Sequence, residues 1–144
     1  TERGDDQMVI NIRLDGNPPT KTAQQRGETI INGHIHHYEK KEVTRVKDVL
    51  RWQLKSYVPK EPLGGPISLK IEWRFELKRC KRRFWKVTRP DLDNLEKGLL
   101  DVLTDMHFWN DDAQVCIKQT CKKEVPPGEG FLEIEIRQIG GDQS

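Results

Sequence analysis

No apolar run in the sequence approaches the ~20 residues that a membrane-spanning helix needs. The first residues, TERGDDQ, also lack the apolar stretch of a signal peptide. Only three cysteines occur and none forms a C-x-x-C pair, so neither a disulfide framework nor a cysteine zinc site is indicated. Repeats, heptads and low-complexity tracts are missing too. We therefore expect one cytoplasmic domain over residues 1–144, with disordered tails at 1–7 and 140–144.

Charges are abundant, but their two signs nearly cancel. The chain has 25 Lys or Arg against 23 Asp or Glu, a formal net charge of +2. Residues 78–89, KRCKRRFWKVTR, contain seven basic residues and no acidic one. Subtracting those seven charges from +2 leaves −5 on the rest of the chain. A basic segment on an otherwise acidic chain favours one surface that binds a polyanion.

Alternation of apolar and polar residues predicts several β-strands. The clearest is 67–77, in which six apolar side chains share one face: Ile67, Leu69, Ile71, Trp73, Phe75 and Leu77. Shorter patterns predict strands at 8–14, 115–123 and 131–138, and Asn32-Gly33 predicts a tight hairpin within 28–38. The basic segment 78–89 would then be a loop that leaves the edge of the sheet.

Two segments have helical periodicity, 39–57 and the stretch after Pro90. In the second, one amphipathic stripe contains Leu92, Leu95, Leu99, Val102, Leu103 and Met106. The element order fits an α+β domain in which a mixed β-sheet is covered by two helices. Phe108 and Trp109, just after this helix, are expected in the core.

The segment RPDLDNLEK, residues 89–97, places Asp91 and Asp93 where extended chain becomes helix. Residues i and i+2 of an extended chain project to the same side, and two such carboxylates suit Mg²⁺ or Mn²⁺. The alternative is ordinary helix punctuation, in which one Asp caps the helix and the other offsets its dipole. The spacing alone favours capping.

Three neighbouring features move the balance toward a metal. Lys97, one turn beyond Asp93, could stabilise a phosphate oxygen, although it could also merely pair with Asp93. Asp111 and Asp112 supply a second acidic pair, or else a solvated turn. The basic segment adjoins Asp91, and acidic groups beside a phosphate-binding surface are favourable when a cation lies between them.

RPDLDNLEKGLLDVLTD, followed by FWNDDAQV, resembles the RusA family of Holliday-junction resolvases. The loop GNPPTKT, the basic run and the final LEIEI strand agree, so the resemblance covers about residues 8–139. It implies a RusA-like fold and a Mg²⁺-dependent homodimer, with Mn²⁺ as a substitute ion. Such an enzyme resolves four-way junction DNA by paired symmetric incisions in recombination and repair, and is associated with the nucleoid when bound to DNA.

The resemblance also implies site residues. Asp91, Asp93 and Asp112 would be catalytic metal ligands and Lys97 the catalytic lysine, with Asp111 and Asp101 in a second tier. A helix over 92–106 is ~22 Å long, and residues 107–112 span at most ~20 Å. Asp112 therefore either just returns to the helix start or comes from a partner subunit.

Other polar and aromatic residues allow weaker predictions. Phe84 and Trp85 either anchor the basic loop to the core or stack on unpaired bases, and anchoring is favoured. His34, His36 and His37 lack a ligand partner at suitable spacing, so a solvated or DNA-facing hairpin is expected rather than a metal site. The predicted DNA phosphate contacts are Lys81, Arg82, Arg83, Lys86, Arg89, Lys21 and Arg26.

Two other functional classes remain open at this stage. One is a non-catalytic junction- or DNA-binding protein whose carboxylates are structural. The other is a metal-dependent nuclease that acts on RNA or on a different branched substrate.

Overall fold

The computed structural model describes residues 7–20, 27–31, 34–38, 41–79 and 84–140, and within 27–43 it describes only the backbone. The predicted tails therefore fall mostly outside the described residues. The elements are β1 (Val9–Asp15), β2 (Gly27–Ile31), β3 (His34–Tyr38), α1 (Lys41–Leu54), η2 (Lys55–Tyr57), β4 (Ile67–Glu76), β5 (Phe84–Trp85), α2 (Leu92–Asp105), η3 (Asp112–Gln114), β6 (Val115–Val125) and β7 (Phe131–Gln138).

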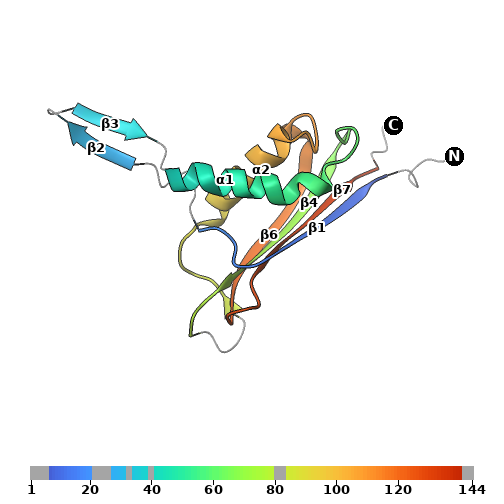
Figure 1. The fold of residues 1–144 in the computed structure, drawn as a ribbon. Coiled ribbons are helices and arrows are strands. Elements are labelled where there is room, and N and C mark those ends of the chain that lie inside the picture. The colour runs from blue at the N-terminus through green and yellow to red at the C-terminus, as the bar shows by residue number, and fades with distance from the viewer. Residues whose placement is uncertain (1–6, 21–26, 32–33, 39–40, 80–83, 141–144) are drawn as a thin grey trace.

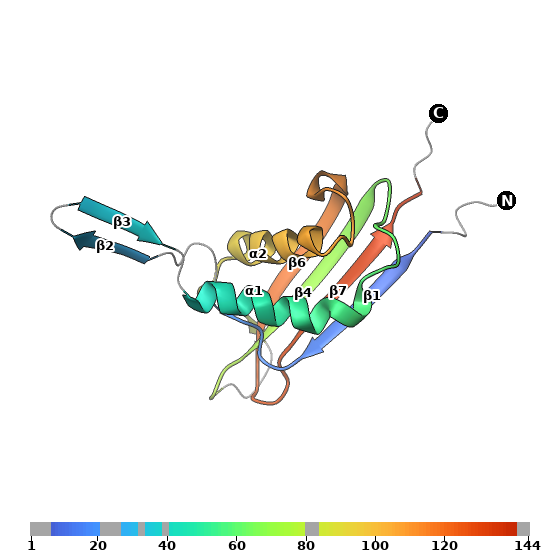
Figure 2. The same cartoon turned by 45° about the horizontal axis from the view of Figure 1, so that its top comes forward.

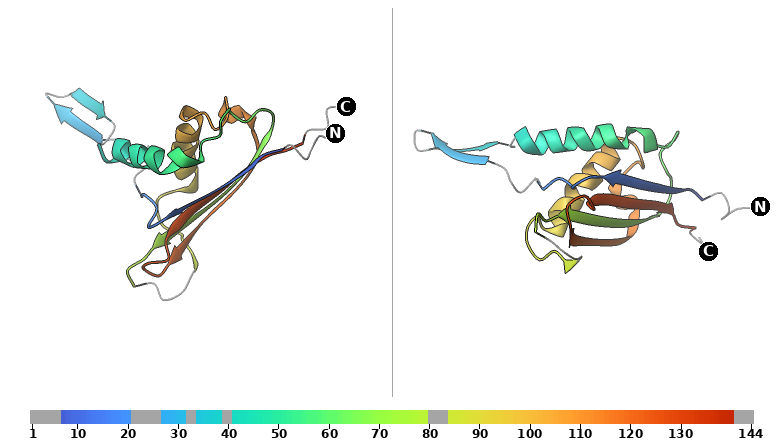
Figure 3. Two further views of the ribbon diagram at one scale, coloured as in Figure 1. Left: turned by 45° about the vertical axis from the view of Figure 1, so that its right-hand side comes forward. Right: turned by 60° about the horizontal axis from the view of Figure 1, so that its bottom comes forward.

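Five strands form one mixed sheet in the order β1-β7-β4-β6-β5. β4 and β6 run parallel, and the other neighbours are antiparallel. β6 and β7 are consecutive in the chain, but β4 lies between them. Both α-helices lie on the same face of this sheet (Figures 2 and 3). The prediction of an α+β domain with a mixed sheet under two helices is confirmed.

The alternating side chains of β4 form the centre of the core. Ile67, Leu69, Ile71, Trp73 and Phe75 are each no more than 3% exposed. The prediction for Leu77 is wrong, because β4 ends at Glu76 and the Leu77 side chain is 41% exposed. The face opposite the helices carries the polar partners of the alternation.

The amphipathic stripe of α2 packs on this core as predicted. Leu95, Leu99, Val102 and Leu103 are buried, while Leu92 and Met106 pack at its margin. Phe108 and Trp109 are also fully buried, which confirms their assignment to the core. α1 adds Leu50 and Leu54 to the cluster, and an ion pair of 3.2 Å between Arg51 and Asp105 joins the two helices.

The second sheet is the hairpin of β2 and β3, which projects from the body beyond the start of α1 (Figure 1). Its backbone confirms the predicted hairpin, with Ile31 opposite His34. The side chains of His34, His36 and His37 lie outside the described part, so their role stays a prediction. Among the described helices, none combines the length and apolar character that crossing a bilayer requires.

Candidate active site

The start of α2 does not use its aspartates as caps. Asp91 occupies the N-cap position with extended backbone angles, φ −73° and ψ 148°. Its side chain makes no capping hydrogen bond to the described residues of α2. Asp93 accepts a hydrogen bond of 3.0 Å from the backbone N–H of Asn94, its immediate neighbour. The alternative in which one carboxylate caps the helix is therefore wrong, and both side chains are exposed to solvent.

A lysine of β6 fixes the turn that leads into Asp91. The Lys122 ammonium donates hydrogen bonds of 2.6 Å to the Thr88 carbonyl and 2.7 Å to the Pro90 carbonyl. Burial lowers the pKa of Lys122 and the nearby Lys86 lowers it further, whereas Asp91 acts in the opposite direction. Lys122 thus holds the backbone on the N-terminal side of Asp91. It lies 32 residues after Pro90, in a strand whose pairing with β4 fixes its position.

Beside α2 lies a hollow of about 260 Å³, which we call the α2 hollow. Its lining contains three of the four residues predicted as catalytic, and Asp91 is not among them. Among the described residues Lys97 has no ion-pair partner, so the alternative pair with Asp93 is not formed. The α2 hollow is lined by Asp93, Glu96, Lys97, Leu100, Asp101, Asp112 and Lys118.

A tight reversal after α2 explains how Asp112 reaches the α2 hollow. His107 has a positive φ of 67°, and its N–H donates to the Thr104 carbonyl at 3.0 Å. The Phe108 N–H donates to the Leu103 carbonyl at 3.1 Å, which completes the hydrogen-bond pattern of a Schellman turn. Trp109 is then anchored by its indole N–H, which donates to the Thr104 hydroxyl at 2.7 Å. The chain therefore turns back at once along α2.

The two aspartates that follow have different surroundings. Asp111 forms a capping box with Gln114, since its carboxylate accepts from the Ala113 N–H at 2.9 Å and the Gln114 side chain accepts from the Asp111 N–H at 3.0 Å. This engagement leaves Asp112 as the member of the pair that lines the α2 hollow. Asp101 also lines it, 4.0 Å from the Lys47 ammonium.

Two residues of the α2 hollow were missed by the sequence analysis. Glu96 is only 7% exposed, and its carboxylate lies 2.6 Å from the Lys118 ammonium. Lys118 belongs to a set of alternate β6 side chains that pair in register with buried residues of β4 and so share their face of the sheet. A polar period of two in VCIKQTCKKEV was the available signal. This set, the polar row of β6, contains Lys118, Thr120, Lys122 and Glu124.

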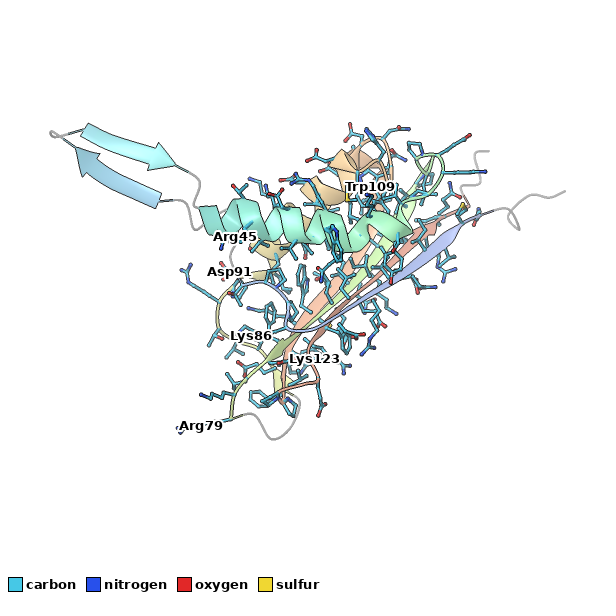
Figure 4. The ribbon with its side chains drawn as sticks, viewed as in Figure 1. Arg45, Arg79, Lys86, Asp91, Trp109 and Lys123 are labelled. Atoms are coloured by element: carbon cyan, nitrogen blue, oxygen red, sulfur yellow. The ribbon has the colours of Figure 1, made fainter. Side chains whose placement is uncertain are left out.

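The basic segment is partly a strand rather than only a loop, because β5 pairs antiparallel with the end of β6. The Lys86 ammonium lies 3.7 Å from Glu124, and the Lys86 side chain is 11% exposed, which makes it less available to DNA. Arg89 is exposed. In Figure 4, Lys86 lies between Asp91 and Arg79. Five predicted contacts lie outside the described residues, namely Lys81, Arg82 and Arg83 of the basic segment and Lys21 and Arg26 of the first loop.

The aromatic pair of β5 does not anchor this segment to the core. Phe84 and Trp85 are 44% and 63% exposed, so the favoured prediction for them is wrong. β5 is a two-residue strand at the edge of the sheet, where β6 is its only strand neighbour among the described residues.

The carboxylate oxygens around the α2 hollow are the kind of ligand that a hard divalent cation prefers, but fewer than three described ligands lie close together. Among the described residues, no three Asp, Glu, His or Cys side chains lie close enough to hold a metal ion together. Asp93 and Asp112 nevertheless offer carboxylate oxygens beside open space. Mg²⁺ commonly binds through one or two carboxylates and retains several waters, so this donor set is sufficient in chemistry.

Comparisons with known proteins point to one family. Residues 16–137 match the family model described as Endodeoxyribonuclease RusA. A protein of Lactococcus phage r1t named crossover junction endodeoxyribonuclease rusA is 33% identical over 133 residues, 90% of this chain and 97% of that protein. A Shigella sonnei protein of the same name is 33% identical over 128 residues, 87% of this chain and 92% of its own length. The Escherichia coli K12 protein is 38% identical over 80 residues, 56% of this chain and 58% of its own length.

Proposed function

The chain belongs to the RusA family of endodeoxyribonucleases, and on that premise we propose that it is a Mg²⁺-dependent nuclease that resolves four-way DNA junctions. Its relatives' name, crossover junction endodeoxyribonuclease, supplies the substrate class. Paired symmetric incisions need two active sites, so we propose a homodimer. The enzyme would act on cytoplasmic DNA, associated with the nucleoid, in recombination and repair.

One observation carries this proposal beyond family membership. Asp93 and Lys97 lie in the first half of α2 and Asp112 lies in η3 beyond its other end, yet the three line one hollow. Structural aspartates would be expected to be engaged as Asp111 is, in a capping box. Carboxylates beside an ammonium that pairs with no described residue suit the hydrolysis of a phosphodiester instead.

We assign separate roles to the residues of the α2 hollow. Asp93 and Asp112 would provide oxygen ligands, and Asp91 would add a third from the N-terminal side of Asp93. When bound, Mg²⁺ would supply Lewis-acid chemistry and an activated water. Lys97, which has no ion-pair partner among the described residues, would stabilise negative charge that develops on the phosphate. Lys118 is neutralised by Glu96 and would shape the wall of the hollow.

We also propose that each site is completed within one subunit, because Asp93 and Asp112 line the same hollow of a single chain. Mixed dimers of Asp93→Asn and Asp112→Asn subunits test this point. Completion within one subunit predicts that both sites of the mixed dimer are inactive. Recovery of cleavage at one site would mean that Asp112 acts across the dimer.

The main test is cleavage of a synthetic four-way junction with Mg²⁺, beside a linear duplex of the same sequence. We expect the wild type to cut the junction and Asp93→Asn to be slower by about 10²–10³-fold, the scale of losing one transition-state contact. Asp105→Asn is the matched control, since Asp105 is on the same helix but pairs with Arg51. An uncut junction, or equal rates for wild type and Asp93→Asn, would contradict the proposal.

The absence of three converging ligands among the described residues favours one rival, a non-catalytic DNA-binding protein. It predicts salt-sensitive junction binding that EDTA leaves unchanged, with no incision under any condition. A nuclease for RNA or flaps would instead cut those substrates faster than the DNA junction.

A further inference from the structure

Three exposed apolar residues lie in the second half of the basic segment: Phe84, Trp85 and Val87. We call this group the β5 ridge. Their side chains are 44%, 63% and 90% exposed. Isolated apolar residues on a surface are normal, whereas three exposed apolar side chains within four positions of a strongly basic segment indicate an interaction site. These side chains are not part of the hydrophobic core and do not line the α2 hollow, so they are available to bind a separate ligand.

The central ring of the β5 ridge is fixed by the sheet. Trp85 pairs with Lys123 across the antiparallel ladder, and the Lys86 N–H donates to the Lys122 carbonyl at 3.2 Å. The Lys123 ammonium lies 5.1 Å from the centroid of the Trp85 ring and is itself 3.5 Å from Glu72. One face of the indole is therefore covered by a cation, while its exposure leaves the other face accessible.

The charge around the β5 ridge limits what can occupy it. The segment 78–89 holds seven basic and no acidic residues. Two copies of this surface would repel each other, which disfavours self-association through the ridge. A polyanion that also offers flat apolar faces fits both features, and single-stranded or unpaired nucleic acid has this chemistry. Bases stack on exposed aromatic rings without regard to sequence.

The β5 ridge and the α2 hollow lie at the same edge of the sheet, although Trp85 pairs with Lys123 and so projects to the face opposite Lys118. β5 pairs with β6 at Lys123 and Glu124, and the β6 residue of the hollow is Lys118. Five residues of strand correspond to about 16 Å at ~3.3 Å per residue. A DNA strand that leaves the hollow and crosses the edge of the sheet at β5 would therefore reach Trp85 within a few nucleotides.

We propose that the β5 ridge, with Trp85 at its centre, is a stacking surface for an unpaired base at the centre of the junction. This inference rests on the proposed function, because it takes junction DNA as the ligand. Bases at a branch point unstack at lower cost than bases within a duplex. Trp85 would therefore add selectivity for the junction, whereas exposed Arg89 would add phosphate affinity for any DNA form.

The test measures binding without divalent cations, so that the DNA stays intact. Junctions carry a single 2-aminopurine at each nucleotide near the branch point in turn, and its fluorescence reports stacking. Trp85→Ala is compared with Trp85→Phe, which keeps a ring, and with Trp52→Ala, which removes a Trp that is 78% exposed on α1. Arg89→Ala provides the phosphate-contact control, and thermal unfolding verifies that each variant folds.

We expect wild type to quench at least one position near the branch and Trp85→Ala to lose that signal. Trp85→Ala should bind the junction about fivefold to a hundredfold more weakly and the duplex unchanged. Trp85→Phe should stay within about threefold, and Trp52→Ala should match wild type. Arg89→Ala should weaken junction and duplex alike.

Equal loss of junction and duplex binding in Trp85→Ala, or no loss at all, would overturn the stacking role. So would binding that depends on Trp85 to vesicles of phosphatidylcholine and phosphatidylserine but not to DNA, since the β5 ridge would then be a lipid surface. These results stay separate from the cleavage assay. If the wild type cuts the junction but Trp85→Ala binds it normally, only this inference is wrong. If the base stacks on Trp85 but the wild type never cuts the junction, only the proposed function is wrong.

Discussion

Two adjacent strands of the same sheet, β4 and β6, show opposite chemistry on the same face. They run parallel and in register, so each pair of partners points to one side. On that side β4 places apolar residues that are no more than 3% exposed, whereas β6 places its polar row. The partners are Leu69 with Lys118, Ile71 with Thr120, Trp73 with Lys122, and Phe75 with Glu124.

The difference follows from what covers each strand. The apolar stripe of α2 packs on the core around β4. Every charged member of the polar row instead has a polar partner at or near the candidate site. Lys118 pairs with Glu96 of α2, Lys122 holds the turn before Asp91, and Glu124 pairs with Lys86. β4 should therefore determine stability, and β6 should determine activity.

The largest expected effect lies on the β4 side. Trp73→Ala removes a ring that is 1% exposed, and should lower the free energy of unfolding by about 3–5 kcal/mol. Urea denaturation followed by circular dichroism measures this change. Lys70→Ala on the solvent face of β4 is the control and should stay within about 0.5 kcal/mol. A loss below about 1 kcal/mol for Trp73→Ala would contradict the view that β4 determines stability.

The two lysines of the α2 hollow should differ next most. Lys97→Met should slow single-turnover junction cleavage by about 10²–10³-fold, because no described acidic residue neutralises Lys97. Lys118→Met should slow it less than about tenfold, because Glu96 already neutralises that ammonium at 2.6 Å. Its main effect should be a lower thermal midpoint, since Glu96 loses its partner. Equal kinetic losses would show that the two cations act alike.

Lys122 should have an intermediate effect on activity and little on folding. Lys122→Met removes both hydrogen bonds to the carbonyls that precede Asp91. Loss of such an orienting contact typically costs about 10–100-fold in metal affinity or activity. We expect the Mg²⁺ dependence of cleavage to shift to higher concentration, with Lys70→Met unchanged. An unchanged Mg²⁺ requirement together with a lower thermal midpoint would make Lys122 purely structural.

Sequence alone predicted the parts of the fold in which local pattern and burial coincide. The period of two in β4 and the stripe of α2 each marked a face that becomes core. The prediction that Leu77 is buried was wrong because periodicity does not show where a strand ends, and β4 ends at Glu76. β5 was missed because two residues carry no pattern and exist as strand only through pairing with β6.

The site was predictable only in part, for a similar reason. The acidic residues beside the basic segment drew attention to Asp93, Lys97 and the pair Asp111 and Asp112, and the resemblance to a family then selected Asp112 from that pair. Chain length could only bound the return of Asp112, whereas the actual path depends on His107 in the left-handed region and on the burial of Trp109. The period of two in β6 left open which face meets the site, because Gln119 and Lys123 make the opposite face of the strand polar too, and only the register with β4 distinguishes the two faces.

The smallest expected effect tests that register directly. The pairing that puts Lys122 beside Trp73 also puts Cys121 beside Glu72 on the opposite face. Burial raises the pKa of the Cys121 thiol, and Glu72 raises it further, while Lys123 and Arg74 lower it. Since the thiolate is the reactive form, Cys121 should react with iodoacetamide more slowly than the exposed Cys116.

Glu72→Gln should lower the pKa of Cys121 and speed its alkylation by about threefold near pH 8, because a neighbouring negative charge disfavours the thiolate. Mass spectrometry of each peptide, in a background with Cys80→Ser, follows the two thiols separately. Cys116 is the internal control, and its rate should be the same with and without Glu72. If Cys121 does not respond to Glu72→Gln, the two side chains are not neighbours. In that case the register that sets the polar row of β6 against the core of β4 would be wrong.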